Sequence, residues 1–276
     1  MIAIEELTAT AAKIRLETFR AIARAGGGHF GGSLSVVEIL TVLYFSTMKI
    51  DPRDPHGDER DRFILSKGHA GPALYVTLAE RGFFPREWLG ELDQDGSRLP
   101  KHIDRSRLPG IDVSSGALGQ GLSIGVGIAL GARLDARDTR VYVVLGDGEC
   151  NEGQIWEAAM TAAKYGLHNL TTVIDRNKAQ VDGLSAEVMP TDPLADKWRV
   201  FGWEVLNVNG HNVQQLQTTL DRAKKTRGKP TLIIAETIKG RGVSFMEGRY
   251  EWHSGMVKEE QYSTAISDLE RLLTNG

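Results

Sequence analysis

Oxygen-bearing residues follow two apolar segments of the chain, at the point where each segment ends. Gly146-Asp147-Gly148 comes directly after the run Arg140–Leu145, and Asn177 lies just beyond the run Leu170–Ile174. If both runs are neighbouring strands of a parallel sheet, their carboxyl ends share one edge, where such sheets bind ligands. A carboxylate and an amide oxygen suit Mg²⁺ or Ca²⁺, and Mg²⁺ often completes its coordination with phosphate oxygens. We therefore expect a metal-held diphosphate at this edge; the alternative is that both segments are plain turns.

Short apolar runs alternate with stretches of helical periodicity, and this order sets the expected fold. The helical stretches include Gln154–Tyr165 and Val213–Lys225. Strands that alternate with helices predict an α/β fold, with a parallel sheet and helices on both faces. We expect one domain over residues 1–276. The predicted strands are Arg62–Leu65, Arg140–Leu145, Leu170–Ile174, Trp203–Val208 and Thr231–Ala235.

Helices are also expected near both ends of the chain. Apolar residues at helical spacing from Leu7 to Ile22 predict a first helix that ends at Gly26-Gly27-Gly28. Ser33 is then predicted to cap a second helix, which would run through Val36, Ile39, Leu43 and Tyr44. The Pro- and charge-rich stretch Asp51–Asp61 is expected to be a surface loop, and residues 256–276 an amphipathic helical tail.

The composition is that of an ordinary globular protein and argues against several classes. The chain has 276 residues and a net charge of -3, which disfavours binding to nucleic acid or to an anionic membrane. Its longest apolar stretch is shorter than the roughly 20 residues of a membrane span, and early acidic residues argue against a secretory signal. The only cysteine, Cys150, rules out an intrachain disulfide and is expected to be a buried filler rather than an oxidation-sensitive thiol. We expect a cytoplasmic protein.

The segment from Gly146 to Lys178 resembles the thiamine diphosphate signature, which begins with GDG and ends about thirty residues later with Asn. More narrowly, the chain resembles the diphosphate-binding half of the transketolase family over nearly its whole length. The resemblance implies the thiamine-diphosphate-binding fold. The other segments that match, in the expected order around this one, are GGGHFGGSLS, FILSKGHA, LPGIDVSSGALGQGLS, ETIKGRGVSFME and EWHSG.

This resemblance implies how a cofactor and a metal would be held. The side chains of Asp147 and Asn177 and the backbone carbonyl of Ala179 would ligate Mg²⁺, for which Ca²⁺ could substitute. The Gly148 N–H would bind the diphosphate, as backbone N–H groups do in anion-binding loops. The residues implied to bind the cofactor are His69, Gly116, Ala117, Leu118, Gly146, Gly148, Glu152, Asn177, Lys239 and His253.

Four histidines fall within the matching segments, and the resemblance implies catalytic roles for them. His69 and His253 would lie near the diphosphate, with His253 also reaching the substrate. His29 and His102 would bind sugar hydroxyls and move protons, a task that suits histidine because its pKa lies near neutral pH. A single histidine is more often structural or on the surface, and that interpretation is kept for the three that match no motif, His56, His168 and His211.

Two further positions bear on partners and substrates. Lys101-His102-Ile103 stands where the family usually has Gly-His-Pro, and the spacing to Leu108-Pro109-Gly110 is one residue longer. A changed loop here could mean a changed donor substrate. Glu152 resembles the family's acidic residue at the subunit contact, although an acid at this point would also complement a helix dipole.

The resemblance covers only half of a transketolase. Thiamine diphosphate carries the chemistry itself, but in this family the glutamate that activates it, the aromatic clamp of its ring and the arginines for substrate phosphate lie in a second domain. The chain ends soon after EWHSG and one amphipathic segment. We therefore expect the N-terminal subunit of a split transketolase, active only with a separate pyrimidine-binding chain, in an α2β2 assembly. It would transfer a two-carbon ketol unit from a ketose to an aldose, either sugars or sugar phosphates.

Three other interpretations stay open at this point. The chain could belong to another thiamine diphosphate enzyme, such as the α-subunit of a 2-oxo acid dehydrogenase, deoxyxylulose-phosphate synthase or a specialised biosynthetic transketolase outside the pentose phosphate pathway. A nucleotide-binding oxidoreductase is disfavoured because GDGECNEG displaces the last glycine of G-x-G-x-x-G. A non-catalytic assembly module would need neither the metal pair nor the four histidines.

Overall fold

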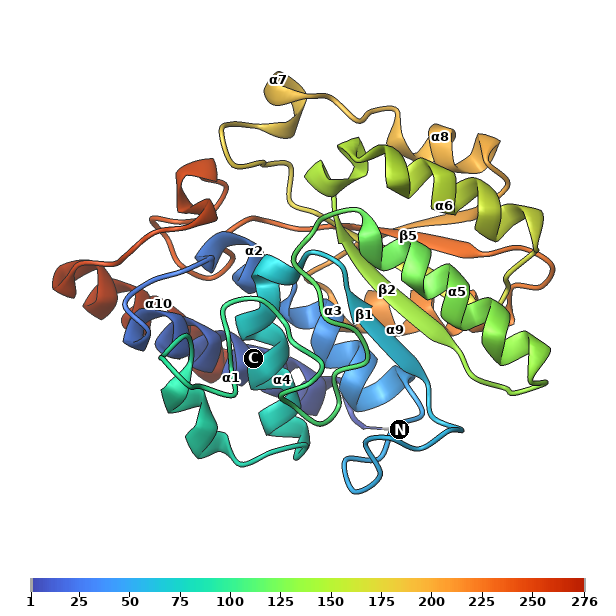
Figure 1. Ribbon diagram of the computed structural model, residues 1–276. Coiled ribbons are helices and arrows are strands. Elements are labelled where there is room, and N and C mark those ends of the chain that lie inside the picture. Colours follow the sequence, from blue (N-terminus) through green and yellow to red (C-terminus); the bar gives the residue numbers. More distant parts are fainter. Residues whose placement is uncertain (1, 276) are drawn as a thin grey trace.

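A five-stranded parallel sheet forms the centre of the computed structural model, which describes residues 2–275 (Figure 1). All five predicted strands are confirmed, with ends within two residues of those expected. The order across the sheet is β1-β2-β3-β5-β4. The strands are β1 (Arg62–Leu65), β2 (Val141–Gly146), β3 (Leu170–Arg176), β4 (Glu204–Asn209) and β5 (Thr231–Glu236).

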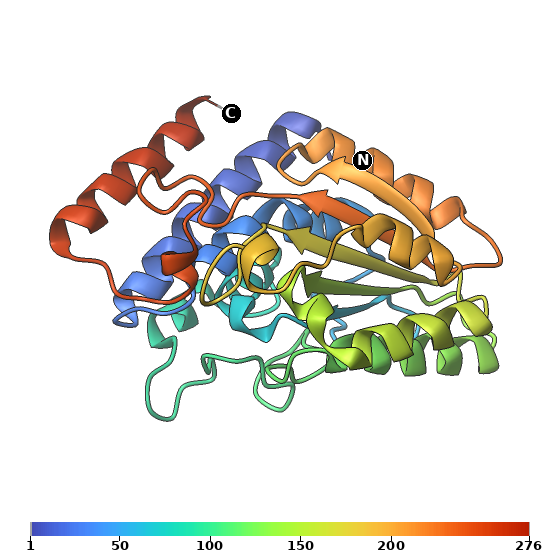
Figure 2. The ribbon, with the colours of Figure 1, turned by 90° about the horizontal axis from the view of Figure 1, so that it is seen from above.

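Helices cover both faces of the sheet, as the alternating pattern predicts. The main helices are α1 (Ile4–Arg24), α2 (Phe30–Ser35), α3 (Val37–Val42), α4 (Gly71–Arg81), α5 (Gln120–Leu134), α6 (Gly153–Lys164), α7 (Ser185–Val188), α8 (Leu194–Val200), α9 (Val213–Lys225) and α10 (Glu259–Asn275). A π-helical turn spans Leu43–Thr47, and 3-10 turns span Gly68–Ala70, Arg86–Glu91, Gly148–Asn151 and Tyr250–His253. Figure 2 shows α5 and α6 on one side of the sheet and α1 and α9 on the other.

The two faces of the sheet bury two separate hydrophobic cores. Along β2, Tyr142 and Val144 pack with α1, α3, α4 and α9, whereas Val141, Val143 and Leu145 pack with α5, α6 and α8. Successive side chains of a strand point to opposite faces, so a strand buried on both sides is apolar throughout. This explains why the strands appear in the sequence as continuous apolar runs.

The first helix is as predicted, but the expected cap at Ser33 is wrong. Helix α2 begins at Phe30, and Ser33 is buried inside it. The preceding glycines cause this early start, because Gly28 pairs with Gly255 through two backbone hydrogen bonds of 2.9 and 3.0 Å. Gly27 can enter this pairing since its φ of 124° is accessible to glycine. The chain therefore turns into the helix directly after His29.

The predicted second helix is not continuous, because it is divided into α2, α3 and the π-helical turn Leu43–Thr47, with Val36 between α2 and α3. The expectations for the surface loop, the cysteine and the tail hold. Residues 51–61 contain turns and no helix or strand, and Cys150 is buried. The amphipathic tail is α10, which packs along α1; the outermost residues of the predicted domain and tail, Met1 and Gly276, lie outside the described residues. No helix between residues 2 and 275 combines the length and the apolar character needed to cross a bilayer.

Candidate active site at the carboxyl edge of the sheet

The two polar segments meet at one edge of the sheet, because β2 and β3 are neighbours. Gly146 pairs in register with Asp175, so Asp147 and Asn177 follow adjacent strands. One carboxylate oxygen of Asp147 accepts hydrogen bonds from the Lys178 N–H at 2.9 Å and from the Ser185 hydroxyl at 3.0 Å. The predicted strand pairing is thus confirmed.

A cavity of about 270 Å³ opens at this edge and is lined by most of the predicted cofactor and metal residues. Gly116 and Ala117 line a separate shallow hollow beside it, next to the start of α5. Leu118 lines the cavity itself and is 37% exposed. The predicted residues that line the cavity are His69, Leu118, Gly146, Asp147, Gly148, Glu152, Asn177, Ala179, Lys239 and His253.

The oxygen atoms at this edge fit a hard divalent cation. Burial, and then the negative charge of Asp175, raises the pKa of the Asp147 carboxyl, so a bound cation would offset a buried charge. The Asn177 amide donates to the Ser35 hydroxyl at 3.3 Å, and this bond fixes its orientation. Within residues 2–275, no three His, Cys, Asp or Glu side chains form a metal-binding group. A site here would therefore combine one carboxylate with amide and carbonyl oxygens, a set that Mg²⁺ accepts.

Two buried lysines line the cavity and give it positive charge. Lys67 and Lys239 are each 1% exposed. Lys67 donates to Asp175 and to the Gly32 carbonyl, while Lys239 donates to the Ala179 and Gln180 carbonyls at 3.1 and 3.3 Å. Burial, and then the nearby Lys67 charge, lowers the pKa of Lys239 to about 8. An anionic group in the cavity would relieve this repulsion, so the site fits a diphosphate.

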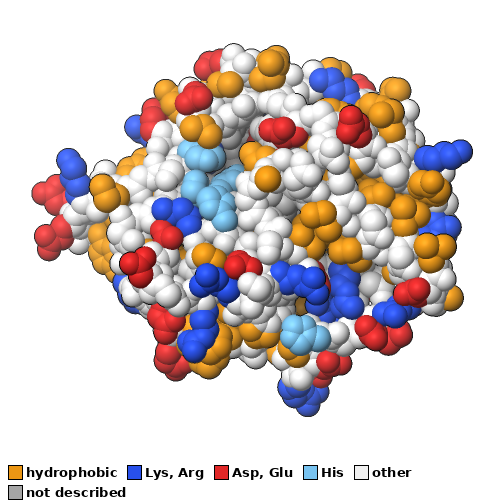
Figure 3. Space-filling model, in the orientation of Figure 1, with side chains coloured by type: hydrophobic (Ala, Val, Ile, Leu, Met, Phe, Trp, Pro, Cys, Tyr) orange, Lys and Arg blue, Asp and Glu red, His pale blue; other side chains and the backbone are white. Residues whose placement is uncertain are grey.

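The four predicted histidines gather in one cluster. The ring centre of His29 lies 5.4 Å from the ring centres of His69 and His253 and 5.9 Å from that of His102. The histidine side chains lie together at the rim of a hollow in Figure 3. His29 Nδ1 is buried and has no hydrogen-bond partner among residues 2–275. The cluster therefore offers an unsatisfied polar atom to a ligand.

The inner histidines are neutral near pH 7. Burial, followed by the charge of His102, lowers the pKa of His29 to about 4, and burial, followed by Lys239, lowers that of His253 to about 3. Burial also lowers the pKa of His69, to well below its usual value. A neutral imidazole has one nitrogen that donates and one that accepts, so each ring can donate a hydrogen bond to a sugar hydroxyl and accept one from it.

Sequence reasoning missed two buried carboxylates that hold this edge together. Glu149 accepts hydrogen bonds from the Ser66 hydroxyl and from the N–H groups of Gly119 and Gly146, the latter two at 2.9 and 3.0 Å. It thereby joins the ends of β1 and β2 to the loop that carries Leu118. The available signal was an acid directly after a strand in a Gly-rich segment.

Asp175 is the second of these carboxylates. It accepts hydrogen bonds from Ser35 at 2.6 Å and from Lys67 and Thr237, so it links α2 with the ends of β1, β3 and β5. Because Ser35 also accepts from Asn177, Asp175 orients the predicted metal ligand indirectly. An acid that closes an otherwise apolar run was the signal for it.

The other predicted positions take different places. Glu152 is exposed at the start of α6 and makes no side-chain capping bond, so it remains free to meet a partner. Nδ1 of His211 lies 3.0 Å from the Glu38 carboxylate, and its Nε2 accepts a hydrogen bond from the Ile238 N–H at 2.8 Å. His211 is therefore a structural residue. His56 is exposed and His168 is half-buried, and neither lines the cavity.

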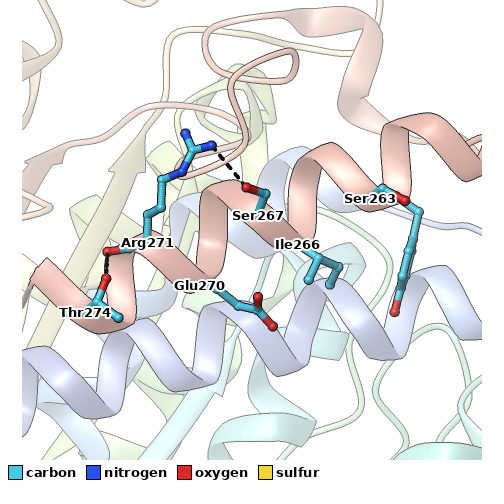
Figure 4. Close-up of a pocket in the computed structure, with 7 residues that line it drawn as sticks. Ser263, Ile266, Ser267, Glu270, Arg271 and Thr274 are labelled. Carbon is cyan, nitrogen blue, oxygen red and sulfur yellow. Dashed lines mark hydrogen bonds between the residues drawn. The ribbon is translucent and has the colours of Figure 1, made fainter.

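A second hollow is lined by residues of α10, and within the described residues it brings no reactive groups together. Arg271 donates to Ser267 at 3.1 Å on the same helix, while Ile266 and Glu270 point toward α1 (Figure 4). Glu270 accepts from Arg20 of α1. These contacts attach α10 to α1, and the chemistry is concentrated at the sheet edge.

Comparison with known proteins agrees with this geometry. Residues 7–269 match the family described as "Transketolase, thiamine diphosphate binding domain". The chain is 48% identical to the 6-deoxy-6-sulfo-D-fructose transketolase subunit of a Clostridium species (strain MSTE9), over 94% of each chain. It is 44% identical to one of the subunits of the apulose-4-phosphate transketolase of Phocaeicola vulgatus, over 96% of this chain and 94% of that protein.

Solved structures give the same match with part of a longer chain. The fold superposes on transketolase from Leishmania mexicana with a TM-score of 0.90 at 29% identity, and covers 100% of this chain. The chain spans 44% of the length of that transketolase. The match therefore confirms the thiamine-diphosphate-binding fold and corresponds to one part of the longer enzyme.

Proposed function

The chain belongs to the transketolase family, and we propose that it works as the N-terminal, diphosphate-binding subunit of a two-chain enzyme that transfers a two-carbon ketol unit from a ketose to an aldose. The observation that carries this proposal is the histidine cluster beside the Asp147–Asn177 edge. Relatives of the same length are named as transketolase subunits, which supports an enzyme over a non-catalytic module.

The residues of the edge would hold the cofactor through its charged end. Mg²⁺ would be ligated by Asp147, Asn177 and the Ala179 carbonyl, with Ca²⁺ as a substitute. Because Lys239 donates a hydrogen bond to the Ala179 carbonyl, this bond would have to break when the metal binds. Lys67, Lys239 and the Gly148 N–H would bind the diphosphate. Gly116, Ala117 and Leu118 would lie against the rest of the cofactor. Thiamine diphosphate supplies the carbanion chemistry of ketol transfer when it is bound.

The histidines would handle the substrate. His29 and His102 would bind sugar hydroxyls and accept or return protons at the reacting carbons. His69 and His253, which line the cavity, would lie against the diphosphate, and His253 would also reach the sugar. Burial lowers the pKa of His29 to about 4, so its imidazole is neutral near pH 7 and can accept a hydrogen bond from a sugar hydroxyl.

The partner and the sugar are the remaining parts of the proposal. A separate pyrimidine-binding chain would complete the site in an α2β2 assembly in the cytoplasm, with Glu152 at the contact. Two relatives are named for a sulfonated and a phosphorylated sugar. We therefore assign to this enzyme a sugar that carries an anionic group, in a specialised pathway rather than the pentose phosphate pathway.

Replacement of Asp147 tests the metal and cofactor assignment. In the assembled complex, Asp147→Ala should abolish Mg²⁺-dependent binding of thiamine diphosphate, because it removes the only charged ligand of the proposed site. Isothermal titration measures this directly. The control is Asp221→Ala, since Asp221 is half-exposed on α9 and its carboxylate lies 3.6 Å from Lys224 Nζ, away from the cavity. Tight binding retained by a folded Asp147→Ala complex would refute the assignment.

A further inference from the structure

Lys101 projects from a rigidly held stretch of chain beside the histidine cluster. The Tyr75 hydroxyl donates to the Pro100 carbonyl at 2.9 Å, and Ile103 is buried on the other side. The Lys101 side chain itself is 47% exposed. It directly precedes His102, whose ring lies 5.9 Å from that of His29. The ammonium group is therefore partly exposed to solvent on the segment that carries His102.

The ammonium of Lys101 has one partner in the described chain, Asp93, and the ion pair between them is partly exposed and therefore weak. Its Nζ lies 3.0 Å from the carboxylate of Asp93, whose side chain is 32% exposed. Exposed ion pairs contribute little to stability and are screened by salt. Asp93 comes from a tight loop, in which its N–H donates to the Leu99 carbonyl at 2.9 Å. A substrate anion could replace this carboxylate without disturbing the loop.

Both members of the pair act electrostatically on the catalytic cluster. The charge of Lys101 contributes to lowering the pKa of His29, and that of Asp93 opposes it. The other lysines at the site are committed differently, because Lys67 and Lys239 are buried and donate to protein acceptors. Lys101 is thus the exposed lysine of the described chain whose charge reaches His29.

We propose that Lys101 is a specificity-determining residue, which binds the phosphate or sulfonate group of the sugar, with Asp93 as the counter-ion that this anion displaces. The inference rests on the proposed ketol-transfer function and adds the substrate class to it. An ammonium group on a flexible stem binds such anions through charge-assisted hydrogen bonds. It also accounts for the chain having lysine where the family resemblance leads one to expect glycine.

The test compares anionic with neutral ketoses in the complex of this chain with its partner. The probes are D-fructose, D-fructose 6-phosphate and a 6-sulfonate analogue of fructose, and the readout is the ratio of kcat/KM for each anionic sugar to that for fructose. Lys101→Gln should lower this ratio about tenfold, the effect of losing one charge-assisted hydrogen bond, mainly through KM. Lys101→Arg should retain most of it. If the ratio falls further for the phosphate sugar than for the sulfonate sugar, Lys101 selects phosphate substrates. The reverse order would identify sulfonate substrates.

Two further variants sharpen the result. Asp93→Asn should raise the ratio because it frees Lys101, and asparagine tolerates the φ of 57° at this position. Lys225→Gln is the control, since Lys225 is exposed at the end of α9, at the opposite edge of the sheet. An unchanged ratio in Lys101→Gln, with normal turnover of fructose, would overturn the inference and leave ketol transfer intact.

A second measurement does not depend on turnover. Inorganic phosphate is titrated into the complex, and the imidazole resonances of His29 and His102 are followed by NMR. We expect saturable shifts in the wild type that are lost in Lys101→Gln and kept in Lys225→Gln. Equal shifts in wild type and Lys101→Gln would overturn the inference. A complex without ketol transfer on any sugar would instead refute the proposed function, while this titration would still decide the role of Lys101.

Discussion

Single side chains hold the loops of the site in place, and Glu149 shows this most clearly. Its carboxylate is buried and accepts three hydrogen bonds, from Ser66, Gly119 and Gly146. The three donors come from the ends of two strands and from the loop of Leu118. A neutral or partly donating group at this point would leave buried N–H groups unpaired, which is costly.

Glu149→Gln should therefore destabilise the chain by about 1–3 kcal/mol, because the amide NH₂ group would face the N–H of either Gly146 or Gly119, which would lose its acceptor. It should also weaken binding of thiamine diphosphate, since the Leu118 loop loses its anchor. Urea unfolding and calorimetric titration measure the two effects. Glu157→Gln, an exposed change on α6, is the matched control. Equal stability of Glu149→Gln and wild type would show that Glu149 is not this anchor.

Sequence reasoning at this scale found the residues within motifs and missed those that support them. It brought Asp147 together with Asn177 because both follow predicted neighbouring strands. It brought His29 together with His69, His102 and His253 because a family resemblance fixes motif residues in one site. Glu149 and Asp175 act through hydrogen bonds to Ser66, Ser35 and Lys67, which come from distant segments. Such pairings depend on how loops approach in space, and spacing along the chain does not contain that information.

Helix α5 is positioned against the sheet by close packing of a glycine. A Cβ atom placed on Gly125 would lie 2.6 Å from a methyl group of Val143 on β2, whereas one placed on Gly127 would meet nothing within 4 Å. The two glycines are two residues apart on the same helix and face opposite environments. The helix carries the Gly116–Leu118 loop at its start, so its distance from β2 also sets the position of that loop.

The two substitutions should have opposite effects on thermal stability. Gly125→Ala should destabilise by about 1–3 kcal/mol, because the methyl group overpacks the contact with Val143. Gly127→Ala should be neutral or stabilising by about 0.5–1 kcal/mol, because alanine favours a helix and loses less backbone entropy. Thermal unfolding followed by circular dichroism compares them. Equal melting temperatures would contradict the packing of α5 described here.

At the scale of elements, apolar periodicity predicted the five strands and the helices α1, α6, α9 and α10, but not α4, α5 or α8. The five strands follow from buried runs between polar turns, and α9 has the predicted bounds Val213–Lys225. Ser33 failed as a helix cap because the contact of Gly28 with Gly255 starts α2 earlier. That contact joins segments more than two hundred residues apart, and no local pattern announces it.

The folded chain contains several buried histidines that are neutral near pH 7, and their low pKa makes the free energy of unfolding depend on pH. The pKa of His29 is about 4 in the folded chain and about 6.5 in an unfolded one. The unfolded state therefore binds more protons between these values. Stability that is fully present above about pH 6.5 is lost as the pH falls toward 4. Buried carboxyls with raised pKa, such as Asp147 and Glu149, act in the opposite direction.

A difference measurement isolates the histidine contribution. Wild type should lose stability relative to His29→Gln as the pH falls from about 6.5 to about 4, because glutamine takes up no proton. Above that window the difference between the two should be constant. Urea midpoints measured at several pH values provide the comparison, and His56→Gln serves as the control because His56 is exposed. A constant difference across the whole range would contradict the low pKa of His29.

The central claim is that this subunit is active only together with a pyrimidine-binding chain. The most direct measurement is size-exclusion chromatography with light scattering on the chain alone and on its mixture with that partner, with ketol transfer assayed in every fraction in thiamine diphosphate and Mg²⁺. We predict activity only in a fraction whose mass corresponds to α2β2. Ketol transfer by the chain alone would mean that the activating glutamate lies within these 276 residues, and it would contradict the account.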